Sequence, residues 1–452
     1  MALSFIEHAK RTIVLAWPII LAQGLSLIAI IVDTVMVGQA GGEELAYLSA
    51  GRSLMFVAMT VGIGLLGGVV VLTARADGAG DHEACGRIWR SGLLYGALVG
   101  AGCCFTVSVG GPIALSLFGL EPSLVAGGGR YLVAMGASMP GTCLLLASSY
   151  FLQGLSRPKP GMVAMLAMLP LNIFLNWVFI YGELGMPRLG ATGAAIATAI
   201  TQWFGAVTLF AYVRGNRALR IYGTGGRWRG TMDAAWRNGR ELRRFGYPLG
   251  VASGLEFLGM TLLIMFAGKM GVVTISAFEV TLNMHLLAFL AAFGMATATS
   301  VRVGNAVGRR DFDSIRMVAV SGVAIGLLFL TPFAVIYAIA PQPFFRMFTP
   351  EEAVHAMALT MMPFLVAAIL FDGVQYIFLH SLRAAGDQLV AAVLQVTAFL
   401  GIMVPAGWIC AVTLGLGGRG LTLGFLIGLA AAALMLGLRF FLVTRRLSER
   451  FA

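Results

Sequence analysis

The stretch TIVLAWPIILAQGLSLIAIIVDTVMVG, residues 12–38, carries a single charged residue, Asp33. A transmembrane helix needs about 20 predominantly apolar residues, and this stretch supplies them. A helix is predicted because backbone polar groups in lipid must be satisfied internally, and the ten-residue alternation of a membrane barrel is absent. No small-residue cleavage site follows the stretch. We therefore expect it to remain in the protein and to act as its own targeting signal.

Eleven further stretches have the same character. Of the 452 residues, 59% are hydrophobic and 11% are charged, whereas a soluble protein carries about 25% charged residues. The sequence therefore predicts an all-α integral membrane protein with twelve transmembrane helices and little chain left for a soluble domain. The predicted cores are residues 12–38, 46–74, 88–109, 126–152, 161–182, 190–213, 246–268, 274–301, 317–340, 355–381, 390–415 and 420–442.

The positions of Lys and Arg predict the orientation. If both termini face the cytoplasm, 25 of the 31 Lys and Arg residues fall on the inner side, 5 fall on the outer side, and Arg52 lies inside the second span. Inner connections of membrane proteins carry this excess of positive charge. The chain has a net charge of +11, and its basic inner connections would contact anionic lipid headgroups. The positive charge therefore does not imply a nucleic-acid partner.

The chain is also predicted to contain an internal repeat. A polar, basic connection, residues 214–245, separates an N-lobe at 1–213 from a C-lobe at 246–452, each with six spans. Six spans per repeat give both lobes the same orientation, related by an axis along the membrane normal, with a cavity between them. At an offset of 230, the matching residues are Trp17-Pro18 with Tyr247-Pro248, Gly24-Leu25 with Gly254-Leu255, Gly38 with Gly268, Gly78 with Gly308, and Asp81 with Asp311; at 227, Phe151-Leu152 matches Phe378-Leu379.

Four acidic residues lie within the predicted spans: Asp33, Glu256, Glu279 and Asp372. A carboxylate at the bilayer centre costs at least about 2.5–3.5 kcal/mol, so such a group should face the protein interior or a wet cavity. Glu256 is twelve residues beyond Arg244, about 18 Å along a helix and near the midplane. Glu279 is only a few residues into its span. For it, a carboxylate that reaches the headgroups is an equally good interpretation.

The fifth and sixth predicted spans add polar residues. Asn172 and Asn176 lie one turn apart on one helix face, and Thr198 is a candidate neighbour. Their oxygens can coordinate a hard cation or hydrogen-bond to a protonated carboxyl group. Hydrogen bonding between helices is the alternative role, and the sequence leaves both open.

Several short motifs along the chain are together specific: Trp17-Pro18, Val32-Asp-Thr-Val-Met-Val-Gly38, Gln153-Gly154, Gly193-Ala-Ala-Ile-Ala-Thr198, Gly254-Leu-Glu256, Arg302-Val-Gly304 with Gly308, and Asp372 with Ser381-Leu-Arg383. On these motifs the chain resembles the multidrug and toxic compound extrusion (MATE) family, in particular its NorM-type bacterial branch, nearly from end to end. This resemblance implies a V-shaped pair of six-helix lobes in the bacterial inner membrane, which exports amphipathic cationic compounds in exchange for Na⁺ or H⁺. We expect a monomer without a cofactor.

The resemblance also implies roles for individual residues. Glu256 and Asp372 match the cation-site carboxylates of the C-lobe, and Asp33 matches the N-lobe acid. The polar residues around that acid match Asn172, Asn176 and Thr198. One position departs from the NorM pattern, because Ala368 stands where a Tyr is expected one turn before Asp372. Tyr376, one turn after it, is the candidate substitute, and we assign Tyr376 and Glu279 to the substrate cavity. The departure favours H⁺ over Na⁺ as the coupling ion.

Two other functions compete with this interpretation. A flippase for lipid-linked sugars of the same superfamily would need basic residues in its cavity, whereas the charges predicted to be buried here are acidic. An intramembrane enzyme would need a catalytic cluster. The sequence has no HExxH motif, and His285, His355 and His380 are interpreted as packing or interfacial residues. No phosphate-binding GxxxxGK[ST] loop is present, which argues against an ATP-driven pump.

Overall fold

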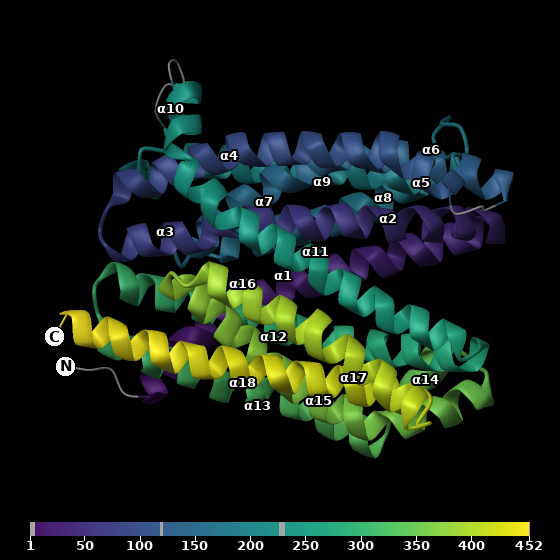
Figure 1. Cartoon of the computed structure of the whole chain (residues 1–452). Helices are drawn as coiled ribbons and strands as arrows, with labels where there is room; N and C mark the ends of the chain where they lie inside the picture. Colours follow the sequence, from purple (N-terminus) through teal and green to yellow (C-terminus); the bar gives the residue numbers. More distant parts are fainter. Residues whose placement is uncertain (1–4, 118–120, 226–230, 452) are drawn as a thin grey trace. The chain divides into compact units, whose positions relative to one another are not determined.

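The computed structural model describes residues 5–117, 121–225 and 231–451, which are almost entirely helical (Figure 1). Within these ranges, twelve helices are long and apolar enough to cross a membrane, and each coincides with a predicted stretch. The predicted fold class is therefore confirmed. The first half contains α1 (Phe5–Ala40), α2 (Gly42–Leu66), α3 (Gly68–Gly78), α4 (His82–Phe105), α5 (Gly111–Leu117), α6 (Pro122–Gly136), α7 (Ser138–Gly154), α8 (Lys159–Tyr181), α9 (Gly190–Gly215) and α10 (Thr231–Asn238). The second half contains α11 (Arg240–Lys269), α12 (Val272–Gly308), α13 (Phe312–Ile339), α14 (Gln342–Phe348), α15 (Glu352–Ala385), α16 (Gln388–Val396), α17 (Val404–Trp408) and α18 (Gly418–Phe451).

The internal repeat is visible in the backbone. Several residues with positive φ have a counterpart with positive φ 230 positions away, at the turn between equivalent helices. Two aspartates at the same offset cap equivalent helices: Asp81 Oδ1 accepts from the Ala84 amide of α4 at 2.8 Å, and Asp311 Oδ1 from the Ser314 amide of α13 at 3.3 Å. Side-chain caps of this kind satisfy amides that a helix start leaves unpaired. The pairs with positive φ are Gly41 (154°) with Gly271 (106°), Gly80 (72°) with Arg310 (58°), and Ser156 (58°) with Gly386 (103°).

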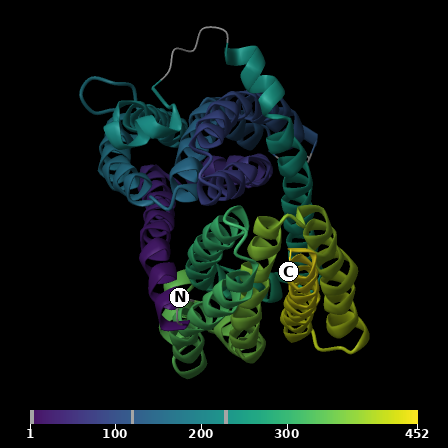
Figure 2. The same ribbon diagram turned by 90° about the vertical axis from the view of Figure 1, so that its left-hand side faces the viewer.

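The chain forms two compact units. The N unit is Leu21–Val251, and the C unit combines Met1–Ile20 with Ala252–Ala452. Within each unit the long helices run side by side, and Figure 2 shows them nearly end-on. In the C unit, α1 begins and α18 ends at the same end of the bundle (Figure 1), as an even number of spans requires.

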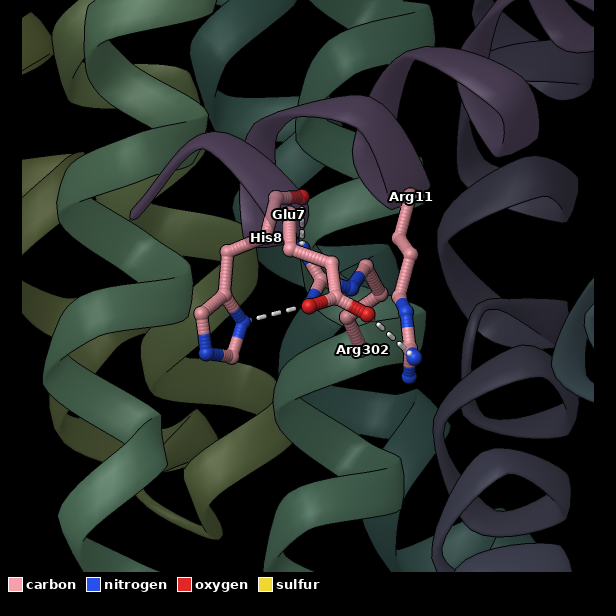
Figure 3. Close-up of polar contacts among 4 residues, drawn as sticks. All are labelled: Glu7, His8, Arg11 and Arg302. Carbon is pink, nitrogen blue, oxygen red and sulfur yellow. Dashed lines mark hydrogen bonds and ion pairs between the residues drawn. The ribbon is translucent and has the colours of Figure 1, made fainter. Parts of the chain in front are cut away.

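The compact units differ from the predicted lobes at both boundaries, and polar contacts explain the first difference. Arg302 of α12 donates to the carbonyl oxygen of His8 and to Thr12 Oγ1, both at 2.5 Å, and its Nη2 lies 2.6 Å from His8 Nδ1. A Glu7–Arg11 ion pair of 2.9 Å lies on the same turns of α1 (Figure 3). These bonds attach the first turns of α1 to α12. Residues 5–20 therefore pack with the second half of the sequence.

The described part of the predicted connection 214–245 folds onto the N unit. Tyr222 is 5% exposed and donates to Asp77 Oδ1 at 3.0 Å. Ser91 Oγ of α4 donates to the Ala235 carbonyl of α10 at 2.8 Å, and Arg90 Nη1 donates to the Gly223 carbonyl at 2.8 Å. Since these bonds join the connection to α3 and α4, its described residues belong structurally to the N unit.

Close helix contacts account for part of the high glycine content. A Cβ atom on Gly100 of α4 would lie 2.5 Å from the Cα of Pro140 in α7. In the C unit, a Cβ on Gly424 of α18 would collide with the backbone of Gly407 in α17. Small residues allow helices to approach this closely. In lipid the hydrophobic effect does not drive helices together, so close packing of this kind stabilises their association.

The core of the N unit brings five helices together around the site described below. It joins α1, α2, α6, α8 and α9 through Val37, Leu48, Leu132, Ile180 and Ala191, each at most 2% exposed. Closely packed protein interiors allow little movement of the side chains within them. The polar groups that α1, α8 and α9 direct into this unit are consequently held in fixed positions.

Candidate functional site

Asp33 in the N unit is the centre of a polar cluster built by three helices. Asn176 Nδ2 of α8 donates to Asp33 Oδ1 at 2.6 Å, and Thr198 Oγ1 of α9 donates to Asp33 Oδ2 at 3.2 Å. Asn176 also contacts Asn172 Oδ1, one turn earlier on α8, at 3.3 Å. Asn172 and Asn176 are 4% and 0% exposed. The structure thus brings together all four residues that the sequence had grouped here.

A cavity of about 110 Å³ adjoins this cluster. Asp33, Asn172 and Thr198 line it, together with Arg52 of α2. Arg52 Nη1 donates to Thr34 Oγ1 at 2.8 Å, so its guanidinium is held next to the turn that carries Asp33. The rest of the lining is mainly apolar, but a cavity of this volume has room for several water molecules, which these polar side chains can hydrogen-bond. A small ion or a proton carried by water can therefore be accommodated beside the carboxylate.

Glu256 of α11 belongs to a second cluster, in the C unit. Gln395 Nε2 of α16 donates to Glu256 Oε2 at 2.5 Å. Gln395 Oε1 in turn accepts from Arg383 Nη2 of α15 at 2.9 Å. Gln395 and Arg383 are 1% and 7% exposed. One amide therefore links a partly buried carboxylate to a buried guanidinium across three helices.

Asp372 of α15 has a different pair of partners. His285 Nε2 of α12 lies 3.2 Å from Asp372 Oδ2, and Gln375 Nε2, on the next turn of α15, donates to Asp372 Oδ1 at 2.9 Å. Asp372 is 4% exposed. His285 packs as interpreted from the sequence, with its ring centroid 5.0 Å from that of Phe425, and it contacts Asp372 in addition. Its ring nitrogen is positioned to share a proton with the carboxylate, since imidazole can donate or accept at either nitrogen.

The two residues assigned to a substrate cavity, Glu279 and Tyr376, have different surroundings. Glu279 of α12 is half-buried, and its backbone carbonyl accepts from the Asn283 side chain at 2.8 Å. Tyr376 packs in an aromatic group with ring centroids 5.0 Å from Phe289, 6.0 Å from Phe293 and 4.7 Å from His380. Their contacts do not test the assignment to a substrate cavity, which stays a prediction.

The donor set of these clusters consists of carboxylates, amides and hydroxyls. In the described part of the chain, no group of three or more His, Cys, Asp and Glu side chains is arranged to hold a metal ion. A hard cation near Asp33 would depend on amide and hydroxyl oxygens, such as Asn172 Oδ1 and Thr198 Oγ1, in addition to the carboxylate.

The MatE family model matches the chain twice, at residues 18–178 and 248–409. The chain belongs to the MatE family. The two matches begin at positions that differ by the 230-residue offset of the repeat, so each half is one copy of the family's unit.

Curated relatives of this MatE chain agree with the assignment. A probable multidrug resistance protein NorM from Caulobacter vibrioides is 32% identical over 443 residues, which cover 94% of this chain and 90% of the relative. The protein of the same name from Rhizobium meliloti is 31% identical, with 98% of this chain and 96% of the relative covered. The resemblance to the NorM branch inferred from the sequence is confirmed.

Solved structures agree on the MatE fold. The crystal structure of the eukaryotic MATE transporter AtDTX14 superposes with a TM-score of 0.87 at 22% identity, covering 99% of this chain and all of that one. An outward-facing multidrug resistance MATE transporter gives a TM-score of 0.86 at 21% identity, covering 97% of this chain and 96% of that one. These likenesses show the shared fold. Membership of the MatE family, together with the NorM relatives, makes the chain a transporter rather than an enzyme.

Several polar residues of this MatE chain were not assigned to a site from the sequence. Arg383 had been placed in a connection, but the structure buries it in α15, and Arg52 had been noted only as lying inside a span. Gln375 and Gln395 had been passed over. A signal for them did exist: a Gln or Arg inside an apolar span needs a partner, just as an acid does.

Proposed function

We propose that the chain is a secondary active multidrug efflux antiporter that exchanges H⁺ or Na⁺ for amphipathic, mostly cationic organic compounds by alternating access. The observation that carries the proposal is Asp33, hydrogen-bonded by Asn176 and Thr198 beside a small cavity inside a membrane-spanning unit. A carboxylate in such a place is neutralised by a proton or a cation, and loading and unloading that ion is what coupling requires. The names of the NorM relatives support drugs as the cargo.

We propose H⁺ rather than Na⁺ as the coupling ion. Both oxygens of Asp33 accept from donor groups, as do both oxygens of Asp372, whereas Na⁺ would need several oxygens to converge. Asn176 can serve both protonation states of Asp33. Its Nδ2 donates to the carboxylate, and its buried Oδ1, which accepts no hydrogen bond from any described residue, can accept from a protonated carboxyl. Ala368, which cannot supply a hydroxyl beside Asp372, points the same way.

Glu256 and Asp372 are the proposed coupling carboxylates of the second half. Each is held by a group that can compensate charge. Gln395 connects Glu256 to Arg383, and His285 contacts Asp372 directly. Protonation of either acid would change the charge balance of its cluster, and a helix rearrangement that depends on that balance would then be linked to the ion gradient.

The proposal includes a location and an organisation. The excess of Lys and Arg on one side predicts that both termini lie in the cytoplasm, and the NorM relatives support the bacterial inner membrane as the location. We propose that it acts as a monomer. Residues 1–213 and 246–452 would form the two transport lobes, and the basic connection 214–245 would lie at the cytoplasmic surface.

The flippase alternative gains one argument from the structure. The expectation that the buried charges would be acidic was incomplete, because Arg383 is also buried and Arg52 lines the cavity beside Asp33. In the C unit, however, Gln395 links Arg383 to the Glu256 carboxylate. This arrangement compensates the guanidinium internally, so it is not presented to anionic cargo. Drug efflux therefore remains the better-supported function, and the relatives' names favour it too.

Ethidium efflux from proteoliposomes containing the purified chain tests the proposal. A pH gradient and a Na⁺ gradient are imposed separately, each with and without an ionophore that dissipates it. The proposal predicts efflux driven by the pH gradient and stopped by the proton ionophore. Efflux that requires Na⁺ would contradict proton coupling, and the absence of efflux under either gradient, alongside transport of an anionic lipid-linked sugar, would favour the flippase.

A further inference from the structure

The surface of the N unit carries an apolar groove of about 530 Å³. Helices α4 and α9 each pack against α7 and flank the groove. Leu93 and Ala97 of α4, Leu144 of α7, and Val207 and Trp203 of α9 line it. A volume of this size lies within the range of about 300–1,000 Å³ found for small-molecule sites.

Two arginines stand at one end of the groove. On α4, the lining residues Leu93 and Ala97 follow Arg90 by three and seven positions, and on α9, Val207 and Trp203 precede Arg214 by seven and eleven. These spacings place each arginine on the helix face that forms the groove. Because α4 begins and α9 ends near its arginine, both guanidiniums lie at the same end of the unit.

The surroundings of these arginines leave them available to an anion. Arg90 Nη1 donates to the Gly223 carbonyl, which fixes the side chain without neutralising it. Arg214 is exposed, and neither arginine forms an ion pair with a carboxylate of the described residues. Guanidinium groups bind phosphate oxygens with short, charge-assisted hydrogen bonds.

The groove has the depth of one membrane leaflet. At the rise of an α-helix, Ala97 lies about 10 Å from Arg90 along α4, and Trp203 lies about 16 Å from Arg214 along α9. Half of a typical hydrocarbon core is about 15 Å thick. At the deep end, Trp203 Nε1 donates to the Ala137 carbonyl at 3.0 Å, which holds the indole in place.

We propose that this groove binds one anionic glycerophospholipid, with its phosphate between Arg90 and Arg214 and one acyl chain along the apolar wall. Charge complementarity selects the headgroup, and the match in depth selects an acyl chain over a soluble ligand. Ala235 of α10 also lines the arginine end, where Ser91 holds that helix. The bound lipid would therefore contact α4, α9 and α10 together. This site does not depend on the coupling ion or on the exported compound.

Native mass spectrometry of the full chain in detergent tests the site, with dioleoyl phosphatidylglycerol and dioleoyl phosphatidylcholine as probes. The wild type is expected to bind one phosphatidylglycerol tightly. Arg90→Gln combined with Arg214→Gln should weaken that binding about thirty-fold, since each basic residue contributes roughly five-fold. Ala97→Phe, which fills the groove and leaves the charge unchanged, should also weaken it.

The matched control is Arg217→Gln combined with Arg220→Gln, which removes the same charge from exposed positions just beyond α9. It should change phosphatidylglycerol binding less than about threefold. Equal losses in both arginine pairs would show diffuse surface attraction and overturn the site. Equal affinity of the wild type for the two lipids, or unchanged phosphatidylglycerol binding in Ala97→Phe, would also overturn it. A protein dimer that Ala97→Phe abolishes would show that a second copy of the chain, and not a lipid, occupies the groove.

Discussion

Replacing Gln395 with Leu is expected to destabilise the C unit more than any other neutral change in the coupling clusters. Gln395 is 1% exposed, so water cannot take over its hydrogen bonds. The substitution removes one bond to Glu256 of 2.5 Å and one to Arg383 of 2.9 Å while nearly conserving volume. Both bonds end on a charged group.

The size of the effect follows from these two bonds. Hydrogen bonds to charged groups contribute about 1.5–3 kcal/mol each, whereas bonds between transmembrane helices average about 0.6 kcal/mol. Taken together, these values predict that the free energy of unfolding falls by about 2–4 kcal/mol in Gln395→Leu. Chemical denaturation in lipid–detergent micelles, followed by tryptophan fluorescence, measures it.

A matched control lies on the same helix. The Gln388 side-chain oxygen accepts no hydrogen bond from the described residues, so Gln388→Leu should change stability by less than about 0.5 kcal/mol. A double-mutant cycle of Gln395→Leu with Glu256→Gln should give a coupling energy of about 1–3 kcal/mol. Equal effects of the two Leu substitutions, or strict additivity in the cycle, would refute the buried linkage described here.

Three further outcomes are expected. Asp372→Asn and Glu256→Gln should each abolish coupled efflux while the protein still inserts and purifies normally, because an amide cannot exchange a proton; wild-type efflux in both would remove these acids from the coupling mechanism. In a drug-sensitive host, the chain should confer resistance to cationic amphipathic compounds, and a resistance profile confined to anions would contradict the substrate class. Gly80→Ala should lower stability by about 1 kcal/mol because Gly80 has φ 72°, whereas Gly102→Ala, in open space within α4, should not; equal effects would show that the turn is not strained.

The fold could be predicted almost completely from the sequence. Membrane helices have a strong signal, because each needs a long run of apolar residues, and all twelve runs appear as helices. The repeat was predictable because residues that cap or end helices recur at one offset, as Asp81 and its counterpart Asp311 illustrate. The attachment of the start of α1 to α12 was not predictable, since it depends on Arg302 meeting His8 across 294 positions of sequence.

The candidate sites divide in a similar way. The acids could be found because charge in lipid is costly, and Asn172 and Asn176 because they share a helix face. The partners that the structure adds, His285 to Asp372 and Gln395 to Glu256, come from other helices. Pairing between helices depends on how they are rotated about their axes, and apolar patterning fixes that rotation poorly when lipid and protein interior are both apolar.

The most direct test of proton coupling through Asp33 is transport by Asp33→Asn in proteoliposomes given only a pH gradient. The substitution keeps the shape of the side chain next to Asn176 but removes the carboxylate that would carry the proton. Asp313→Asn, on an exposed turn of α13, is the control. If Asp33 carries the coupling proton, the wild type and the control will export ethidium, and Asp33→Asn, reconstituted in equal amount, will not. Export by Asp33→Asn at the wild-type rate, or wild-type export that begins only when a Na⁺ gradient is added, would contradict proton coupling through Asp33.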